Sequence, residues 1–272
     1  MTSNVLFLGT CGDNQSAQRQ TRASGGIILE YNDLAFLINP GPGSLVRAKQ
    51  FGYNLRKLIG IMMTDTTLLA SNDVNAVIDC MTYSGQDRRG LLIGPKECFD
   101  SENKPVINEY RNFVEKIIYM EAQKKVAIDD IEVYGLKTNK LITIGYKITT
   151  PDFTLCYLPD PVFSAEICDD LVDCDVLIIG LKHEPNQSVI ADNGLTFAQV
   201  SKIISIAKPR LTIISDLSSS VIETDPINIA RTLQKETGQQ VVSAKDGMSF
   251  NPRTYTKPKR DNKYTVYMRG RE

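Results

Sequence analysis

The chain has 272 residues, of which 42% are hydrophobic and 23% are charged, an ordinary composition for a soluble globular protein. Its 31 basic and 32 acidic side chains leave a formal net charge of −1, so no overall positive field attracts nucleic acid or an anionic membrane. No apolar run reaches the roughly 20 residues that a bilayer span requires, and the polar start does not resemble a signal peptide. We therefore expect a cytoplasmic protein without a membrane partner.

Strands are predicted wherever short runs are rich in β-branched and apolar residues. Helices are predicted where an apolar stripe has helical spacing, and Gly238 is expected to end the last of them. In chain order, the predicted strands are 5–9, 26–31, 34–39, 58–63, 91–94, 131–136, 141–149, 153–158, 176–179, 211–215 and 240–244, and the predicted helices are 72–82, 197–207 and 226–237. Early hairpins followed by alternating strands and helices favour an α/β fold, an αββα sandwich of two sheets between helices.

The chain shows no repeat at solenoid spacing and no low-complexity linker, which favours one domain over residues 1–256. Residues 257–272 form a basic C-terminal tail. This tail is expected to be a free arm or an interface strand built on Tyr264, Val266 and Tyr267.

The six cysteines are scattered along the chain and form no Cys-x-x-Cys pair. Several lie in apolar runs, where a thiol behaves as a small hydrophobic group. We expect free, buried thiols and neither disulfides nor a zinc ribbon. The six are Cys11, Cys80, Cys98, Cys156, Cys168 and Cys174.

Glycine-rich turns follow the early strands, as in Phe7-Leu8-Gly9-Thr10-Cys11-Gly12 and Ile38-Asn39-Pro40-Gly41-Pro42-Gly43-Ser44. With Ser24-Gly25-Gly26-Ile27 and Met81-Thr82-Tyr83-Ser84-Gly85, these turns resemble the metallo-β-lactamase superfamily, in particular a branch of uncharacterised hydrolases near ribonuclease Z. The resemblance covers nearly the whole chain. It implies the metallo-β-lactamase type of αββα sandwich and an ancestry among metal-dependent hydrolases.

The same resemblance implies a zinc-binding His-x-His-x-Asp-His loop after the fourth predicted strand. Residues 65–70 read Asp-Thr-Thr-Leu-Leu-Ala, so Asp65, Thr67, Leu69 and Ala70 stand at the ligand positions. Further along, Thr138 and Asp216 stand where other histidines are expected, and Asn39 stands where an aspartate supports a ligand. At the implied ligand positions, only Asp160 keeps the residue type, a carboxylate that bridges two metals in the family.

Zinc needs imidazole or thiolate ligands because oxygen donors alone hold it poorly. The chain has a single histidine, His183, which we interpret as a surface or loop-packing residue. We therefore expect no zinc and no other cofactor. An alternative is that Asp65, Asp160 and Asp216 converge and hold Mg²⁺ or Ca²⁺. Another is that Asp65 and Asp216 are solvated or paired with Lys or Arg in a vestigial cleft, since clustered carboxylates without a cation repel and raise their pKa values.

Three functions follow as hypotheses. The first is a catalytically inactive relative that acts as a binding, scaffold or regulatory subunit, as a homodimer or with an active paralogue or larger complex. The second is a phosphodiesterase or nuclease that uses Mg²⁺ or Mn²⁺ on Asp65, Asp160 and Asp216. The third is a nucleic-acid-binding module that contacts phosphates without cleavage. Possible ligand or partner contacts are Arg88, Arg89 and His183.

Overall fold

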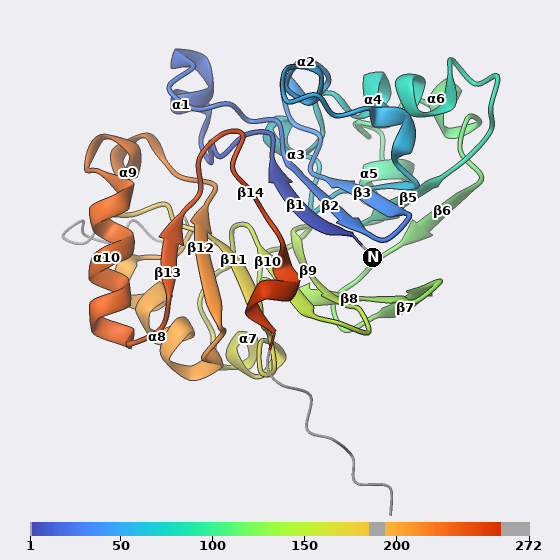
Figure 1. Cartoon of the computed structure of the whole chain (residues 1–272). Helices are drawn as coiled ribbons and strands as arrows, with labels where there is room; N and C mark the ends of the chain where they lie inside the picture. Colours follow the sequence, from blue (N-terminus) through green and yellow to red (C-terminus); the bar gives the residue numbers. More distant parts are fainter. Residues whose placement is uncertain (1, 185–193, 257–272) are drawn as a thin grey trace, which may run out of the picture.

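The computed structural model describes residues 2–184 and 194–256. Two seven-stranded sheets pack face to face, and helices cover the outer face of each sheet (Figure 1). This arrangement confirms the predicted αββα sandwich. The predicted tail, 257–272, lies outside the described residues.

The first sheet has the strand order β14-β1-β2-β3-β4-β5-β6. Its β14, β1, β2 and β3 pair antiparallel, whereas β3 to β6 pair in parallel. The parallel strands are short and almost wholly apolar, as expected for strands covered on both faces. The bounds are β1 Ser3–Phe7, β2 Ile27–Tyr31, β3 Leu34–Ile38, β4 Gly60–Met62, β5 Leu91–Gly94, β6 Lys116–Tyr119 and β14 Ser249–Phe250.

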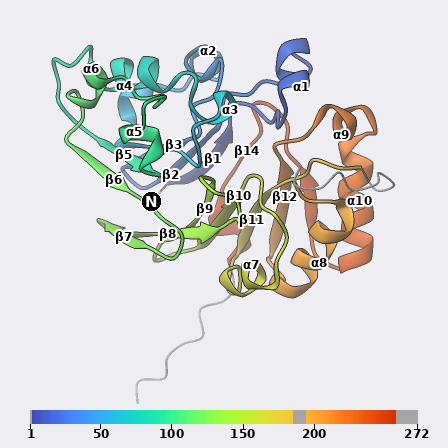
Figure 2. The ribbon, with the colours of Figure 1, turned by 180° about the vertical axis from the view of Figure 1, so that it is seen from behind.

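The second sheet has the order β13-β12-β11-β10-β9-β8-β7. Its β7 to β10 pair antiparallel, and β10 to β13 pair in parallel. The edge strands β6 and β7 of the two sheets lie on the same side of the molecule in both views (Figures 1 and 2). The bounds are β7 Lys125–Ile128, β8 Ile131–Lys137, β9 Ile144–Thr149, β10 Thr154–Leu158, β11 Val176–Gly180, β12 Leu211–Ser215 and β13 Val241–Ser243.

The helices follow the strands that they cover. Over the first sheet lie α2, α4, α5 and α6, whereas α7 to α10 lie over the second, and α1 and α3 stand at one end of the sandwich (Figure 1). The bounds are α1 Asn14–Arg19, α2 Ser44–Gln50, α3 Leu68–Ser71, α4 Val74–Thr82, α5 Glu97–Asp100, α6 Asn108–Arg111, α7 Ala165–Asp170, α8 Phe197–Ala207, α9 Ser219–Glu223 and α10 Pro226–Thr237, with short 3-10 helices η1 Leu55–Lys57 and η2 Pro252–Tyr255.

Three apolar layers hold these elements together. The inner layer fills the space between the sheets and includes Phe7, Phe36 and Tyr146. Two outer layers fix the helices on their sheets, one of them around Met81 of α4 and the other around Leu233 of α10. Burial of such side chains supplies roughly 1.5–3 kcal/mol each. The sheets are therefore rigid supports for the loops at their ends.

Most of the predicted elements are present. The structure confirms helices 197–207 and 226–237, and Gly238 ends the second of these with φ 67°. The predicted helix 72–82 begins two residues later, at Val74. Strands β6, β7 and β14 and the short helices were not predicted, because segments of two to seven residues are too short to show a clear apolar periodicity. All six cysteines are free, and all but Cys80 are buried, as expected.

In the described part of the chain, no helix has the length and apolar character that a bilayer span requires.

Candidate functional site

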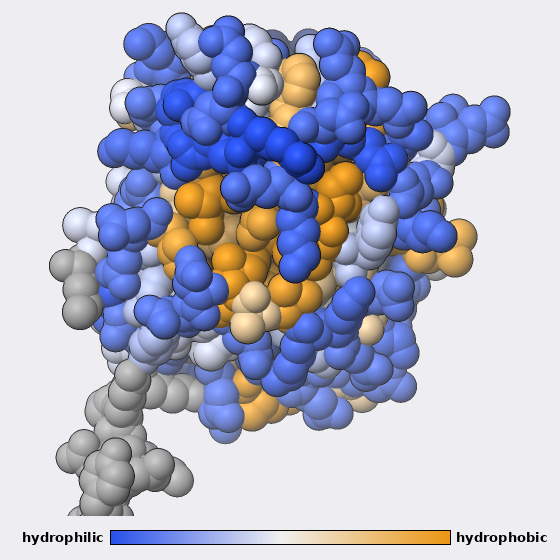
Figure 3. All heavy atoms as spheres, turned by 90° about the vertical axis from the view of Figure 1, so that its right-hand side faces the viewer, coloured by the Kyte–Doolittle hydropathy of each residue, from blue (hydrophilic) through white to orange (hydrophobic). Residues whose placement is uncertain are grey.

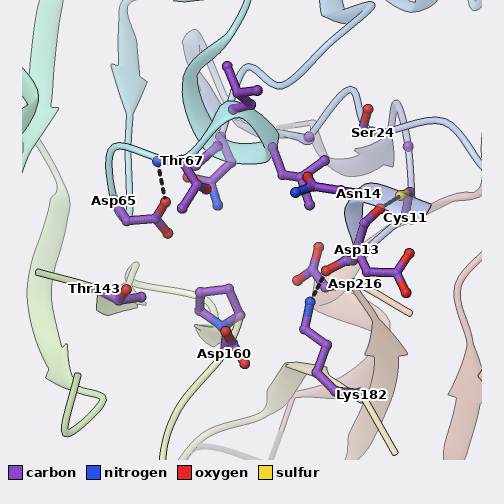
Figure 4. A pocket seen from close by; sticks show the side chains of 18 of the residues that line it. Cys11, Asp13, Asn14, Ser24, Asp65, Thr67, Thr143, Asp160, Lys182 and Asp216 are labelled. Carbon is purple, nitrogen blue, oxygen red and sulfur yellow. Dashed lines mark hydrogen bonds between the residues drawn. The ribbon is translucent and has the colours of Figure 1, made fainter. Parts of the chain in front are cut away.

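A cavity of about 550 Å³ opens at the end of the sandwich where the parallel strands terminate. Figure 4 shows this pocket with Asp65 on one wall and with Asp216 and Lys182 on the other. Parallel strands bring their carboxyl ends to one edge of a sheet, so loops far apart in sequence meet here. The lining residues come from the loops after β1, β3, β4, β8, β10, β11 and β12.

Asp65 is fixed by the turn that follows β4. Its Oδ1 accepts the backbone N–H of Thr67 at 2.8 Å, and its Oδ2 accepts the hydroxyl of Thr64 at 2.9 Å. Thr67 is the residue before α3, so the carboxylate also lies at the start of a short helix. Both oxygens of Asp65 therefore have protein donors without any metal.

A chain of hydrogen bonds crosses the floor of the pocket from Asp65 to Asp216. The Asn39 side-chain amide donates to the Thr64 hydroxyl at 2.9 Å and to the Tyr157 hydroxyl oxygen at 3.2 Å. The Tyr157 hydroxyl in turn donates to Asp216 Oδ2 at 2.9 Å. Asn39 thus links the two carboxylates through neutral groups, a role that an aspartate at position 39 could not fill as a donor.

Asp216 is the most perturbed carboxyl of the pocket. Burial raises its pKa from 3.8 to about 6, and the neighbouring Asp160 and Asp65 also raise it. The Lys182 ammonium and the Tyr157 hydrogen bond act in the opposite direction. The backbone of Asp216 has φ 46°, in the left-handed region that non-glycine residues seldom adopt. Asp216 therefore combines an unfavourable backbone conformation with a carboxylate whose ionisation is disfavoured by burial. Such a combination is often found at functional sites.

The Lys140 ammonium forms an ion pair with Asp160 Oδ2. Lys140 comes from the loop between β8 and β9, and Asp160 follows β10. Both side chains are partly buried, with 23% and 33% of their surface exposed, so this contact is less screened by water than a surface ion pair. The loop that carries Lys140 is held by the buried Thr138, whose hydroxyl donates to the Thr143 carbonyl.

The Lys182 ammonium donates to the backbone carbonyl of Gly12 and lies close enough to Asp216 to lower its pKa (Figure 4). This packing depends on glycine at position 12. A Cβ there would lie 1.8 Å from the Asp216 carbonyl oxygen and 2.7 Å from Lys182 Nζ. Only glycine allows the loop after β1 to approach Asp216 and Lys182 so closely.

The predicted pocket residues are largely brought together. Asp65, Thr67, Leu69, Ala70, Asp160 and Asp216 all line the cavity. Thr138 does not line it but supports the loop of Lys140. Asn39 lines the cavity floor.

The other predicted contacts lie elsewhere. Arg88 and Arg89 precede β5 and therefore lie at the opposite end of the first sheet from the pocket. Arg88 Nε donates to the Val114 carbonyl at 3.1 Å, and Arg89 lies 3.8 Å from Asp87. His183 is buried, with 5% of its surface exposed, and does not line the cavity.

The donor set of the pocket does not fit a zinc centre. None of the lining residues is a histidine, and the ammonium groups of Lys140 and Lys182 stand among the carboxylates. Within residues 2–184 and 194–256, no group of three or more His, Cys, Asp or Glu side chains is arranged to hold a metal ion. In the same part of the chain, Asp160 Oδ1 is a buried oxygen without a hydrogen-bond partner, and one such atom is too few to hold a cation.

The two lysines were not recognised from the sequence as pocket residues. One feature of the sequence could have indicated Lys182. It lies two residues after β11, and β11 lies in the sheet between β10 and β12, the strands that are followed by the pocket residues Asp160 and Asp216. Lys140 gave no such signal because it lies within a loop between antiparallel strands.

No family model matches the chain. An uncharacterised protein from Methanocaldococcus jannaschii is 21% identical over 254 residues, which are 91% of this chain and 94% of that protein. Among solved structures, the metallo-β-lactamase fold protein YhfI from Bacillus subtilis has a TM-score of 0.76 at 16% identity, covering 91% of this chain and 98% of that one. The short form of human tRNase Z has a TM-score of 0.67 at 13% identity, with coverage of 91% and 98%. The fold is therefore that of the metallo-β-lactamases.

Proposed function

We propose that this chain is a metallo-β-lactamase-fold protein that has lost zinc-dependent hydrolysis and acts as a binding or regulatory subunit. The observation that carries the proposal is the position of two lysines. The ammonium groups of Lys140 and Lys182 lie beside Asp160 and Asp216, two residues at positions where the resemblance implies metal ligands.

The electrostatics support this proposal. Three carboxylates facing one cavity repel one another unless positive charge lies between them. Two ammonium groups supply part of that charge as permanent parts of the chain, and the Tyr157 hydroxyl, which accepts a hydrogen bond from Asn39, donates to Asp216 Oδ2. The raised pKa of Asp216 fits a site where this compensation is incomplete. The framework thus persists without the ligands that hydrolysis requires.

The two alternatives receive less support from the geometry. A Mg²⁺ or Mn²⁺ enzyme would need Asp65, Asp160 and Asp216 as ligands, but Asp160 is paired with Lys140 and both oxygens of Asp65 accept protein donors. A nucleic-acid-binding role for Arg88 and Arg89 would be separate from the pocket, at the other end of the sheet.

The proposal predicts the metal content of the protein purified without chelator. We expect zinc far below one ion per chain by inductively coupled plasma mass spectrometry, and no thermal shift with Zn²⁺, Mn²⁺, Mg²⁺ or Ca²⁺. Near-stoichiometric metal that Asp160→Ala removes would contradict the proposal and favour the carboxylate-based enzyme.

A double variant tests whether the lysines take the place of a cation. Lys140→Met with Lys182→Met removes both ammonium groups and leaves the three carboxylates facing the cavity. We expect this variant to gain a Mn²⁺-dependent thermal shift that the parent protein lacks. Lys137→Met with Lys125→Met is the matched control, because it removes two surface ion pairs away from the cavity. The same response to Mn²⁺ in both double variants would count against the idea that the lysines take the place of a cation.

A further inference from the structure

Within the described residues, no strand or helix covers the side of the sandwich that carries the edge strands β6 and β7. Figure 3 looks onto this side and shows a broad apolar patch framed by polar residues. Partly buried side chains that pack on the inner core here are Leu34, Ile59, Leu91, Ile118 and Val126. We call these five residues the edge patch. They come from the beginnings of β3, β4 and β5 and from the two edge strands.

An uncovered patch of this kind is unusual in a monomeric protein. Contiguous apolar surface is normally a contact site, and an unpaired edge strand offers free backbone groups to another strand. Strand β6 has a neighbour only on the β5 side, and β7 only on the β8 side, within the described residues. The edge patch therefore has both an apolar surface and two strand edges to offer.

The described chain ends near one border of this patch, the border formed by Leu34. Helix η2 is held at the turns between β2 and β3 and between β9 and β10. Its Arg253 forms an ion pair with Asp152 at 2.6 Å and donates to Asn32 at 3.2 Å. Asn32 lies in the turn that leads into Leu34, the first residue of the edge patch. The described chain therefore ends near the turn between β2 and β3, at the end of the sandwich remote from the pocket.

The sequence beyond this point has the length and pattern to cover the patch. Residues 257–263 span up to roughly 23 Å when extended, and four strand spacings from β2 to β6 amount to about 19 Å. The next residues alternate, so that Tyr264, Val266 and Met268 share one face of an extended segment. The basic residues before them would pass the exposed turns that carry Asp33, Asp129 and Asp130.

We propose that residues 264–268 of the same chain dock on the edge patch as an added strand, with Tyr264, Val266 and Met268 against it. The tail then closes the open side of the sandwich and removes its free strand edges. Two occupants compete with this one, namely the same segment of a second copy and the patch of a second copy.

The test uses a tryptophan probe, because the natural chain contains no tryptophan. In the full-length Tyr264→Trp variant, we expect blue-shifted emission and several-fold weaker acrylamide quenching than for free tryptophan. Adding Val126→Lys places a charge in the patch and is expected to restore free quenching. Val46→Lys is the matched control, since Val46 is 57% exposed on α2, and it should leave the probe protected. Circular dichroism checks that each variant is folded.

Hydrogen exchange provides a second readout that does not alter the patch. Tyr264→Asp with Val266→Asp should speed exchange of the amides in β6 and β7, whereas Thr265→Asp, on the other face of the segment, should not. A freely quenched tryptophan probe in the Tyr264→Trp variant, or protection that Val126→Lys leaves unchanged, would overturn the proposal. Protection that disappears on dilution, together with a dimer in light scattering, would overturn it in favour of a second copy.

Discussion

At the scale of single residues, the pocket is defined by charges that the fold forces together. Asp216 has a raised pKa mainly because burial disfavours its ionised form, while Lys182 and Tyr157 only partly offset that cost. Lys182 depends on Gly12 for its position, and Asn39 depends on being an amide to donate hydrogen bonds. Each of these residues is therefore constrained by a partner that lies far away in the sequence.

Asp216 should make the stability of the protein depend on pH. Because its folded pKa, about 6, exceeds the ordinary 3.8, its contribution to stability is fully present below about 3.8 and is lost as pH rises through about 6. Asp216→Asn should therefore stabilise the protein at pH 7, by at most about 3 kcal/mol, since one pKa unit corresponds to about 1.4 kcal/mol. Urea unfolding between pH 4 and 8 measures this effect.

The control for Asp216→Asn is Asp129→Asn. Asp129 has nearly the same left-handed backbone, with φ 48° against 46°, but lies exposed in the turn between β7 and β8. If both variants gain the same stability, the gain comes from the preference of asparagine for a left-handed backbone. That result would contradict the burial argument.

At the scale of elements, the loops that form the pocket are anchored by the starts of helices. Helix α8 begins at Phe197, just beyond the loop that follows β11 and carries Lys182. Its first turn is closed by a reciprocal pair, in which Thr196 Oγ1 accepts the Gln199 N–H at 3.3 Å and Gln199 Oε1 accepts the Thr196 N–H at 2.9 Å. Such capping fixes where the helix begins and thus where the preceding loop must end.

Thr196→Ala should lower the free energy of unfolding by about 1 kcal/mol, because the cap hydroxyl and its backbone partner are lost. Thr232→Ala is the control. Thr232 lies exposed within α10 with its hydroxyl bonded to Asn228, so alanine there should be neutral or slightly stabilising. Equal losses in denaturant unfolding of the two variants would argue against a specific capping effect.

At the scale of the whole molecule, two tyrosines of the second sheet reach across to the first. Tyr157 bonds Asn39 at the pocket floor, and the fully buried Tyr146 donates to the Met63 carbonyl at 2.5 Å. Both bonds cross the apolar layer between the sheets, where an unmet polar group is costly. They fix the relative position of the sheets at the end where the pocket opens.

Tyr146→Phe should lower the free energy of unfolding by about 1–3 kcal/mol, since it leaves a buried carbonyl without this donor. Tyr83→Phe serves as the control, because Tyr83 is 63% exposed at the end of α4 and should change stability little. Denaturant unfolding compares the two variants. A Tyr146→Phe protein as stable as its parent would show that the cross-sheet bond contributes nothing net.

The sequence by itself determined the helices and strands that are encoded by a pattern within their own segment. The helices 197–207 and 226–237 and most strands follow from apolar periodicity and end caps, and the missing imidazoles at residues 65–70 follow from residue identity alone. The possibility that Asp65 and Asp216 pair with Lys or Arg also followed from the repulsion of like charges, whereas the ion pair in the structure is formed by Asp160 with Lys140.

Only the tertiary structure decided which groups meet. Lys182 and Gly12 are 170 residues apart, and the bond from Tyr157 to Asp216 spans 59 residues, so no local pattern encodes either contact. The open side between β6 and β7 also depends on how two sheets of distant segments align. The physical reason is that apolar periodicity indicates whether a segment is a helix or a strand and which of its faces is buried. Charge pairing and exposed strand edges depend instead on which loops and strands the fold brings side by side.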